Sequence, residues 1–330
     1  MAAHVLGGDI GGTKTDLGVY EIDGRGKIRP VAERRFRSRD HLGLETIVET
    51  FLKDCGQSID AAAFGVAGPV FEQVVQVTNL PWRVERDALA RLLQTPRVHL
   101  MNDLAATAYG ALFLPDSELH VLNEGEDRKG NAAVIAAGTG LGQALLIWDG
   151  RRHLPCGTEG GHADFAPRNA MEVKLLDFLL EELDRVSFER VLSGPGLHNI
   201  LRFVDQVLQV PVADETRKRV ESEDPGRVIG EQGLEGACDA CSQAIDIFLD
   251  IYGAQAGNLA LTTMAVGGIY VAGGPAVKLL PRIEQGGFMG AFVAKGRFEE
   301  LMNSIPLRVV LNPKTCQLGA ARAAADLLDS

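Results

Sequence analysis

A glycine-rich segment near the start of the chain, GGDIGGTKT, is the first place where this sequence could bind an anion. It spans residues 7–15 and lies between an apolar run and an alternating run, which predicts two strands joined by a tight turn. Glycine permits positive φ and leaves the backbone bare, so several N–H groups can converge on phosphate oxygens. The glycines of the segment are Gly7, Gly8, Gly11 and Gly12. An ordinary hairpin turn also fits these residues, and the segment by itself leaves both interpretations open.

Three side chains of this segment extend the phosphate interpretation. Thr13 and Lys14 add a hydroxyl and a cation at the tip of the turn, and Asp9 lies where the first strand ends. A carboxylate at that position could hold Mg²⁺ through water. Two commoner phosphate motifs are missing from the sequence, because G-x-x-x-x-G-K-[ST] does not occur and no G-x-G-x-x-G opens a helix here. The segment is therefore neither a P-loop nor a Rossmann fingerprint.

The pattern of strand, glycine turn and strand recurs at the start of the second half. Residues 131–137 and 143–148 are predicted strands, and the turn GTGLG over 138–142 lies between them. A third glycine turn, Gly273-Gly274-Pro275, ends a strand predicted over 267–272. Two such turns could hold the phosphates of one nucleotide from two domains, and the third could pass close to its adenosine. This repetition favours phosphate binding over three unrelated turns.

A polar pair, Asn102 and Asp103, follows a strand predicted over 98–101 and opens a helix predicted over 103–114. Either side chain could cap this helix, because Asn and Asp are favoured N-cap residues. A carboxylate that faces a cleft there could instead take a proton from a hydroxyl group. The two interpretations are compatible if Asn102 caps the helix and Asp103 reacts.

The richest polar cluster is GTEGGHADFAP, over residues 157–167. Glu159 and His162 lie three residues apart in a glycine-dense, irregular loop, where together they could hold a pair of vicinal hydroxyls. A solvated surface loop is the alternative. Zinc is not favoured, because no cysteine cluster follows and a catalytic zinc takes three protein ligands. Glu189 starts a short helix in FERVLSGP and is unremarkable by itself.

Alternating strands and helices must position these residues, which is typical of an α/β protein with mixed sheets. Further strands are predicted over 27–36, 61–67, 74–77 and 307–311, and helices over 45–55, 86–93, 172–183, 196–210, 237–263 and 317–328. Residues 115–130 are polar and rich in turn formers, so they are expected to mark a domain boundary. Residues 214–235 are charged and interrupted by Pro225, which predicts an exposed helix and loop.

The composition of the chain indicates which kinds of binding partner are unfavourable. The chain has 330 residues and a net charge of −11, which argues against nucleic acid and anionic membranes as partners. No apolar run approaches the ~18 residues of a membrane span, and no signal peptide is expected. Five cysteines, an odd number, fit reduced thiols in a cytoplasm better than a disulfide framework. The pair Cys238 and Cys241 lies in a helical pattern and is expected to be structural.

Taken together, these motifs resemble those of the bacterial glucokinases, within the hexokinase and actin-like sugar-kinase superfamily. GGDIGGTKT is similar to the first phosphate motif of that superfamily, AAGTGLGQA over 136–144 to the second, and YVAGG over 270–274 to the adenosine motif. NDLAATAYGA and QLGAARAAA are similar to the two connecting helices. GTEGGHADFAP and ERVLSGPGL carry the most specific resemblance. A cysteine-rich zinc loop of the related repressor and kinase family is missing, so the zinc-free glucokinase branch is the more similar one.

The resemblance implies a two-domain actin-like ATPase fold of the ribonuclease H type, with a mixed five-stranded sheet and flanking helices in each domain. Residues 1–112 and 312–330 would form the small domain and 113–311 the large domain, with a cleft between them. The implied activity is phosphorylation of D-glucose to glucose 6-phosphate by ATP with Mg²⁺. The enzyme would be cytoplasmic and would form a homodimer.

The resemblance also implies a role for each matching residue. Asp103 would be the general base on the 6-hydroxyl of the sugar. The sugar would be bound by Asn102, Asp103, Glu159, His162 and Glu189. The nucleotide would be bound by Asp9, Gly11, Gly12, Thr13, Lys14, Gly138, Thr139, Gly140, Gly273 and Gly274, with Asp9 next to Mg²⁺ through water. The alternatives are a kinase for another hexose, such as mannose, fructose or an N-acetyl sugar, and an actin-like ATPase that ignores sugars.

Overall fold

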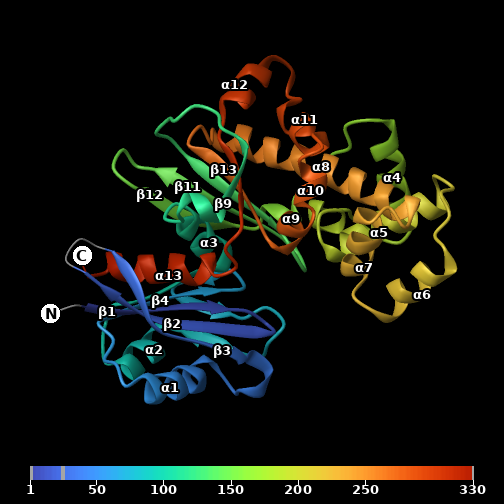
Figure 1. Ribbon diagram of the computed structural model, residues 1–330. Coiled ribbons are helices and arrows are strands. Elements are labelled where there is room, and N and C mark those ends of the chain that lie inside the picture. Colours follow the sequence, from blue (N-terminus) through green and yellow to red (C-terminus); the bar gives the residue numbers. More distant parts are fainter. Residues whose placement is uncertain (1–2, 24–26, 329–330) are drawn as a thin grey trace. The chain divides into compact units, whose positions relative to one another are not determined.

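The computed structural model describes residues 3–23 and 27–328 (Figure 1). The chain divides into two compact units, of which unit 1 lies within residues 1–119, 144–158 and 312–330 and unit 2 within 120–143 and 159–311. A C-terminal segment thus returns to the N-terminal unit, as it does in the domains implied by the resemblance. The domain boundaries after residues 112 and 311 stay a prediction.

Unit 1 is built on a mixed sheet with the strand order β3-β2-β1-β4-β8. The strands are β1 (Ala3–Ile10), β2 (Lys14–Ile22), β3 (Ile28–Arg37), β4 (Ala61–Val66) and β8 (Val98–Asn102). The first three pair antiparallel, whereas β1, β4 and β8 pair parallel. Ile10, Val66 and Asn102 lie in one row of the register. The carboxyl ends of β1, β4 and β8 therefore meet at the same edge of the sheet, where Asp9 and Asp103 are found.

Helices cover both faces of this sheet (Figure 1). They are α1 (Leu44–Cys55), α2 (Arg86–Leu93), α3 (Asp103–Ala111) and α13 (Thr315–Asp326). Side chains alternate between the faces of a strand, so Leu6 and Ile10 of β1 pack in the core with α1 and α2. Val5 packs on the other face with the alanines of α13. A small sheet of β5 (Val70–Phe71), β6 (Val74–Gln76) and β7 (Arg83–Glu85) follows β4.

Glycines allow α13 to pack directly on the backbone of its neighbours in unit 1. A Cβ added to Gly319 of α13 would lie 1.8 Å from the Ala106 carbonyl oxygen of α3. One added to Gly110 of α3 would lie 2.1 Å from the Thr315 carbonyl oxygen. Any larger residue at these positions would force α3 and α13 apart, because real Cβ atoms do not approach other atoms so closely.

The second sheet has the strand order β12-β11-β10-β13-β14-β9. Its strands are β9 (Leu119–Asn123), β10 (Ala132–Ala137), β11 (Leu141–Trp148), β12 (His153–Thr158), β13 (Gly268–Ala272) and β14 (Leu307–Val310). The resemblance implied five strands in each sheet, and this sheet has six. One strand that the sequence analysis missed is β9, which forms within the polar segment 115–130. That segment is therefore not only a boundary, because it supplies an edge strand.

Helices of unit 2 gather around the long helix α8 (Asp239–Thr263), which packs against β10 and β13. Its neighbours include α5 (Gly194–Gln206), α7 (Pro225–Leu234) and α11 (Gly287–Val293). The other helices of unit 2 are α4 (Ala170–Leu180), α6 (Asp214–Ser222), α9 (Gly274–Lys278), α10 (Leu280–Ile283) and α12 (Glu299–Ser304). Within residues 3–23 and 27–328, no helix is long and apolar enough to cross a membrane.

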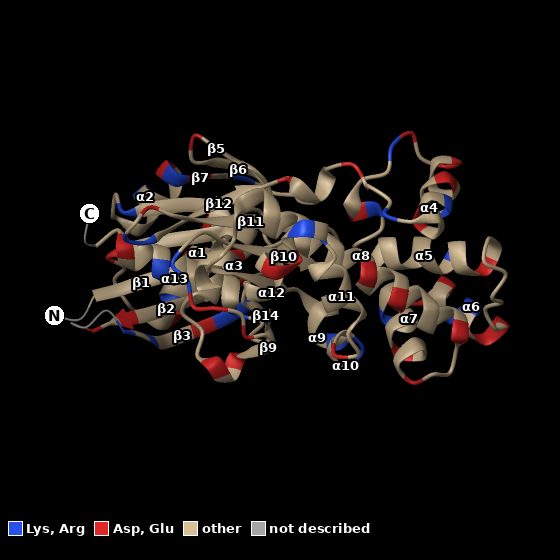
Figure 2. Ribbon diagram, turned by 90° about the horizontal axis from the view of Figure 1, so that it is seen from above, with Lys and Arg blue, Asp and Glu red and all other residues tan. Residues whose placement is uncertain are grey.

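The charged segment 214–235 folds as two helices rather than a helix and a loop. Pro225 occupies the first turn of α7, where its missing N–H costs no hydrogen bond. Asp224 caps that turn by accepting the Gly226 N–H at 3.0 Å. Acidic and basic residues line both helices (Figure 2), and pairs such as Arg227 with Glu231 at 3.0 Å are spaced one turn apart. Pairs of opposite charge at this spacing support an exposed helix only weakly, because solvent screens them.

Replacing Gly319 by alanine should destabilise unit 1. The added Cβ would collide with the backbone of α3, and overpacking of this kind costs about 1–3 kcal/mol. We expect a lower midpoint of urea unfolding, measured by circular dichroism. The matched control is Gly290→Ala on the exposed face of α11, where a Cβ would meet open space and helix propensity should add up to about 1 kcal/mol. An unchanged midpoint for Gly319→Ala would contradict the packing described here.

Candidate active site

The first glycine turn joins β1 to β2, as the sequence predicts. The Gly11 N–H donates to the Lys14 carbonyl oxygen at 2.9 Å and closes the turn. None of the glycines in residues 7–12 has a φ in the left-handed region, so this turn does not use the positive φ that glycine permits. Close approach explains glycine better at the tip, because a Cβ on Gly12 would lie 3.0 Å from the Thr78 carbonyl oxygen.

Ser38, which follows β3, holds this turn in place and was not found by sequence analysis. Its hydroxyl donates to the Gly11 carbonyl oxygen at 2.7 Å, and its N–H donates to the Thr13 carbonyl oxygen at 3.1 Å. The hydroxyls of Ser38 and Thr15 are 3.0 Å apart, and both residues are fully buried. A serine at the end of an arginine-rich strand gives no signal of this role in the sequence.

Asp9 is a largely buried carboxylate at the end of β1, with 21% of its side chain exposed. Burial raises the pKa of Asp9, while the Lys14 ammonium and a hydrogen bond from the Cys316 thiol act in the opposite direction. Lys14 lies 4.0 Å from the carboxylate, which is too far for a strong pair. A buried carboxylate with so little positive charge nearby suits a bound cation.

Mg²⁺ fits Asp9 as a cation carried in by a nucleotide rather than one held by a protein cage. In the described part of the chain, no group of three or more His, Cys, Asp or Glu side chains could hold a metal ion. Mg²⁺ needs no such group, because it usually keeps several waters and binds one or two carboxylates together with substrate phosphates. Asp9 supplies one carboxylate beside the first glycine turn, so the residues present are compatible with that mode.

Asn102 is the N-cap of α3, and the Asp103 carboxylate also accepts a backbone N–H of the first turn, that of Leu104 at 2.9 Å. The catalytic role of Asp103 stays a prediction. The Asn102 side chain accepts the Leu104 N–H at 2.9 Å and the Ala105 N–H at 3.2 Å, so it is the N-cap of α3. Its amide nitrogen donates to the Gly68 carbonyl oxygen at 3.3 Å. Asp103, the first residue of α3, is half-buried at the same sheet edge as Asp9. Capping by Asn102 thus fixes the helix start that carries the Asp103 carboxylate.

Cys316, at the start of α13, packs close to the two acidic residues Asp9 and Asp103. A Cβ added to Gly65 of β4 would lie 2.7 Å from the Cys316 sulfur and 3.4 Å from the Asp103 Cα. The thiol hydrogen-bonds to Asp9, and burial together with the charges of Asp9 and Asp103 raises its pKa well above the usual range. It is therefore a neutral thiol beside two acids. No role of this cysteine could be predicted from the sequence, because its surroundings depend on three elements that are distant in sequence.

In unit 2, the three residues expected to bind the sugar lie together. The His162 Nε2 is 3.9 Å from a Glu159 carboxylate oxygen, and its Nδ1 is 3.9 Å from the Oε1 of Glu189. The side chains of Glu159 and His162 are more than half exposed, whereas that of Glu189 is 30% exposed. This places two carboxylates and an imidazole around one accessible point, which suits polyhydroxylated ligands. Asn102 and Asp103 belong to unit 1.

The second glycine turn packs against this cluster. The Glu189 Oε2 accepts the Leu141 N–H at 2.9 Å. A Cβ on Gly140 would lie 2.4 Å from the same carboxylate oxygen, and one on Gly161 would lie 1.9 Å from the Leu141 carbonyl oxygen. The turn is closed by the Gly138 N–H, which donates to the Gly140 carbonyl oxygen at 2.8 Å. Glycine at 140 is thus needed for Glu189 to reach the backbone of the turn.

The third glycine turn lies at the end of β13, and here glycine does adopt positive φ. Gly273 has a φ of 93°. A Cβ there would also lie 2.1 Å from the Ala137 carbonyl oxygen, at the end of the neighbouring strand β10. The backbones leading into the second and third turns are therefore in direct contact within unit 2.

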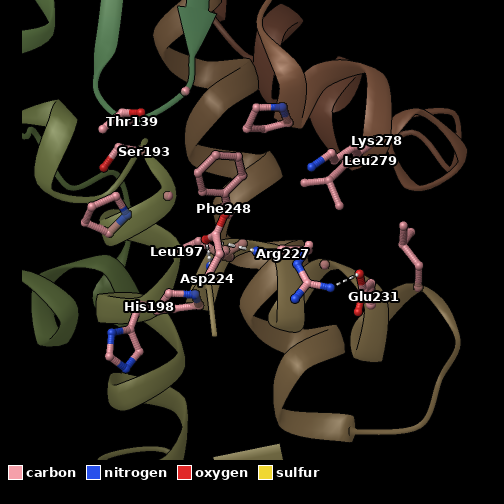
Figure 3. Close-up of a pocket in the computed structure, with 18 residues that line it drawn as sticks. Thr139, Ser193, Leu197, His198, Asp224, Arg227, Glu231, Phe248, Lys278 and Leu279 are labelled. Atoms are coloured by element: carbon pink, nitrogen blue, oxygen red, sulfur yellow. Dashed lines mark hydrogen bonds and ion pairs between the residues drawn. The ribbon is translucent and has the colours of Figure 1, made fainter. Parts of the chain in front are cut away.

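A cavity of about 950 Å³ opens beside these two turns (Figure 3). Thr139 of the second turn, Phe248 of α8 and Lys278 of α9 point toward it. Asp224, the N-cap of α7, and Arg227 of that helix do so as well. Gly138, Pro275 and the start of α5 complete its wall. The size is typical of a small-molecule site. Sequence analysis assigned no function to 214–235, yet α7 forms one wall of this cavity.

The fold and these turns define a class of protein: an actin-like ATPase fold with two α/β sheets, glycine turns at strand ends, and a carboxylate-rich loop suited to a sugar. The family model described as Glucokinase matches residues 6–327, and the chain belongs to that family. A glucokinase of Trichormus variabilis is 40% identical, over 98% of this chain and 99% of the relative. A glucokinase of Caulobacter vibrioides is 35% identical, over 96% and 94%.

Solved structures give the same result for the fold. The crystal structure of a glucokinase from an Antarctic psychrotroph matches with a TM-score of 0.87 and 27% identity, over 99% of each chain. The glucokinase of Balamuthia mandrillaris, solved in complex with glucose, matches with a TM-score of 0.80 at 24% identity, over 98% of this chain and 94% of that one. The expected family and fold class are thereby confirmed.

Gly140→Ala should weaken glucose binding, because the added Cβ displaces the carboxylate that the resemblance places in the sugar site. We expect the KM for glucose to rise about tenfold or more, the effect of losing a hydrogen bond to a charged group. The measurement is a coupled assay of ADP release at saturating ATP.

A double-mutant cycle is the control for this change. If Gly140→Ala acts through Glu189, then adding it to Glu189→Ala should cost little more than Glu189→Ala alone. Additive effects of the two substitutions would show that Gly140 acts by another route.

Proposed function

We propose that this chain transfers the γ-phosphoryl group of ATP to the 6-hydroxyl of D-glucose, with Asp103 as the general base. Phosphorylation of glucose is the activity named for its family and for relatives that share 40% of its residues over nearly the whole chain. One observation in the structure carries the proposal furthest. The cluster of Glu159, His162 and Glu189 is hydrogen-bonded to the second glycine turn, so the sugar-type loop and the phosphate-type turn form one assembly in unit 2.

Asp103 is proposed to take the proton of the sugar hydroxyl. As that proton moves to the carboxylate, the hydroxyl oxygen forms a bond to the γ-phosphorus, and the bond from this phosphorus to the bridging oxygen of ADP breaks. Phosphoryl transfer needs positioning and charge stabilisation more than covalent chemistry. The Asn102 cap supports this role, because it fixes the first turn of α3 on which Asp103 stands.

The sugar is proposed to be held by Asn102, Glu159, His162 and Glu189 through its ring hydroxyls. A site that hydrogen-bonds a hydroxyl discriminates strongly against analogues that lack it, because its own polar groups are then left unpaired. Glu189 is the most constrained of these side chains, since one of its oxygens is already committed to the Leu141 amide. Asn102 is likewise held by its cap of α3, whereas Glu159 and His162 are more exposed and are free to adjust to the sugar.

The nucleotide is proposed to bind the glycine turns. Gly11, Gly12, Thr13 and Lys14 would contact phosphates from unit 1, and Gly138, Thr139 and Gly140 from unit 2, while Gly273 and Gly274 would pass the adenosine. The cavity of about 950 Å³ in unit 2 has room for a nucleoside beside Thr139. Mg²⁺ bound near Asp9 would neutralise part of the phosphate charge. The proposed reaction thus draws on residues of both units.

We also propose that the enzyme is cytoplasmic and forms a homodimer. All five cysteines are free, which supports a reducing compartment such as the cytoplasm. Assembly as a homodimer is supported by the resemblance to bacterial glucokinases.

Asp103→Asn tests the general base. We expect kcat to fall by on the order of 10²–10⁴, because the amide cannot accept the proton, while the KM for glucose changes little. Rates of glucose-dependent ADP release are compared with those of Asp87→Asn, which alters an exposed acid in the first turn of α2 and should leave kcat unchanged. Near-normal turnover of Asp103→Asn would remove Asp103 from this role.

Glu159→Ala tests the sugar loop. We expect the KM for glucose to rise about tenfold or more while the KM for ATP stays within about twofold, since a charged hydrogen-bond partner of the sugar alone is lost. The exposed Glu181 near the end of α4 provides the control, as Glu181→Ala should change neither value. Equal effects on both substrates would place Glu159 outside the sugar site. The same assay with mannose, fructose and N-acetylglucosamine tests the choice of hexose.

A further inference from the structure

The hydroxyl of Tyr252 lies where both glycine turns of unit 2 begin. Tyr252 belongs to α8 and is fully buried. The Ala137 N–H donates to its hydroxyl oxygen at 3.1 Å. The hydroxyl in turn has two acceptors within reach, the Ile135 carbonyl oxygen at 3.2 Å and the Ala272 carbonyl oxygen at 3.3 Å. One side chain thus bonds to the last residues of both β10 and β13.

These strand ends lead directly into the turns. β10 and β13 are parallel neighbours, with Ala136 opposite Ala272 in the register. β10 continues through Ala137 to Gly138, which lines the cavity of unit 2, and β13 is followed directly by Gly273. At the end of a sheet, backbone groups lose their partners on the ladder. Tyr252 supplies those partners from the helix that packs against the sheet, and so ties the two turns to one point.

The surroundings of Tyr252 keep its hydroxyl in this position. Its ring packs edge-to-face on Phe248 and Phe288, with centroids 5.8 Å and 5.4 Å away. Phe248 lies one helical turn earlier on α8 and points toward the cavity (Figure 3). Burial raises the pKa of Tyr252 well above its usual value, so the phenol remains a neutral donor and acceptor. The ring cannot turn away from the strand ends without displacing two other aromatic side chains.

We propose that Tyr252 is a positioning residue for the nucleotide: it sets the spacing between the Gly138–Gly140 turn and the Gly273–Gly274 turn. This inference rests on the proposed function, in which both turns bind ATP. Tyr252 does not touch the ligand. Its effect reaches the nucleotide through the backbone on the β10 and β13 sides of the turns. The sugar cluster is bonded to the second turn on its other side, at Leu141, the first residue of β11. Loss of the hydroxyl should therefore weaken ATP binding more than glucose binding.

Tyr252→Phe is the direct test, because it removes one oxygen atom and keeps the aromatic packing. We expect the KM for ATP, and the Kd for AMPPNP measured by calorimetry, to rise about three- to tenfold, the range typical of one lost hydrogen bond. The KM for glucose should stay within about twofold of its original value. Thermal unfolding of each variant is recorded in parallel, with and without AMPPNP.

Tyr20→Phe is the matched control. Tyr20 is also almost fully buried, and its hydroxyl donates to Glu33 at 3.0 Å in unit 1, away from every residue assigned to the nucleotide. The Tyr20→Phe substitution should lower the melting temperature of the protein without changing its KM for ATP. A Tyr252→Phe variant that loses similar stability but keeps the KM for ATP and the Kd for AMPPNP within twofold would overturn the inference.

The design separates this inference from the proposed function. If the unmodified chain binds AMPPNP but releases no ADP in the presence of glucose, the proposed function fails. The Kd for AMPPNP then still decides the role of Tyr252, since weaker binding in Tyr252→Phe supports it and unchanged binding rejects it. If the chain does not bind AMPPNP, both are rejected.

Discussion

Direct contact between backbones, made possible by glycine, is the constraint on which the rest of this structure depends. In unit 1, Gly110 and Gly319 let α3 and α13 meet with no side chain between them. In unit 2, Gly273 brings the end of β13 against Ala137 of β10. Because interiors are close-packed, a single added methyl at these points must move a whole element. The helix that carries Asp103 and the strands that carry the glycine turns are placed in this way.

The candidate site has few ion pairs, although its proposed ligand carries a negative charge. The chain carries a net charge of −11, yet its proposed ligand is an anion, so attraction has to be local. In the proposed complex, backbone N–H groups of the turns and Lys14 would supply this attraction, and Asp9 would lie next to a cation that arrives with the nucleotide. The neutral Cys316 thiol beside Asp9 adds a hydrogen bond without adding charge.

The sequence predicted those parts of the fold that depend on local pattern. The limits of α2, the hairpin at residues 10–15 and the cap at Asn102 all follow from neighbouring residues. The strand β9 escaped prediction because its side chains are only partly buried and show no clean alternation. Ser38 and Tyr252 could not be found at all, since their hydrogen bonds join residues 20 to 117 positions apart. The wall formed by α7 was missed for the same reason.

The carboxylate of Glu189 is divided between two neighbours, with one oxygen on the Leu141 amide and the other facing His162. If Glu189 binds the sugar as proposed, a lineage that changes its preferred hexose has little freedom at this position, because any replacement also disturbs the adjoining turn. The side chains of Glu159 and His162 are more than half exposed to solvent, and neither is bonded to the adjoining turn as Glu189 is. Divergence in sugar preference among relatives should accordingly accumulate at the exposed members of the cluster, while the shared carboxylate stays fixed.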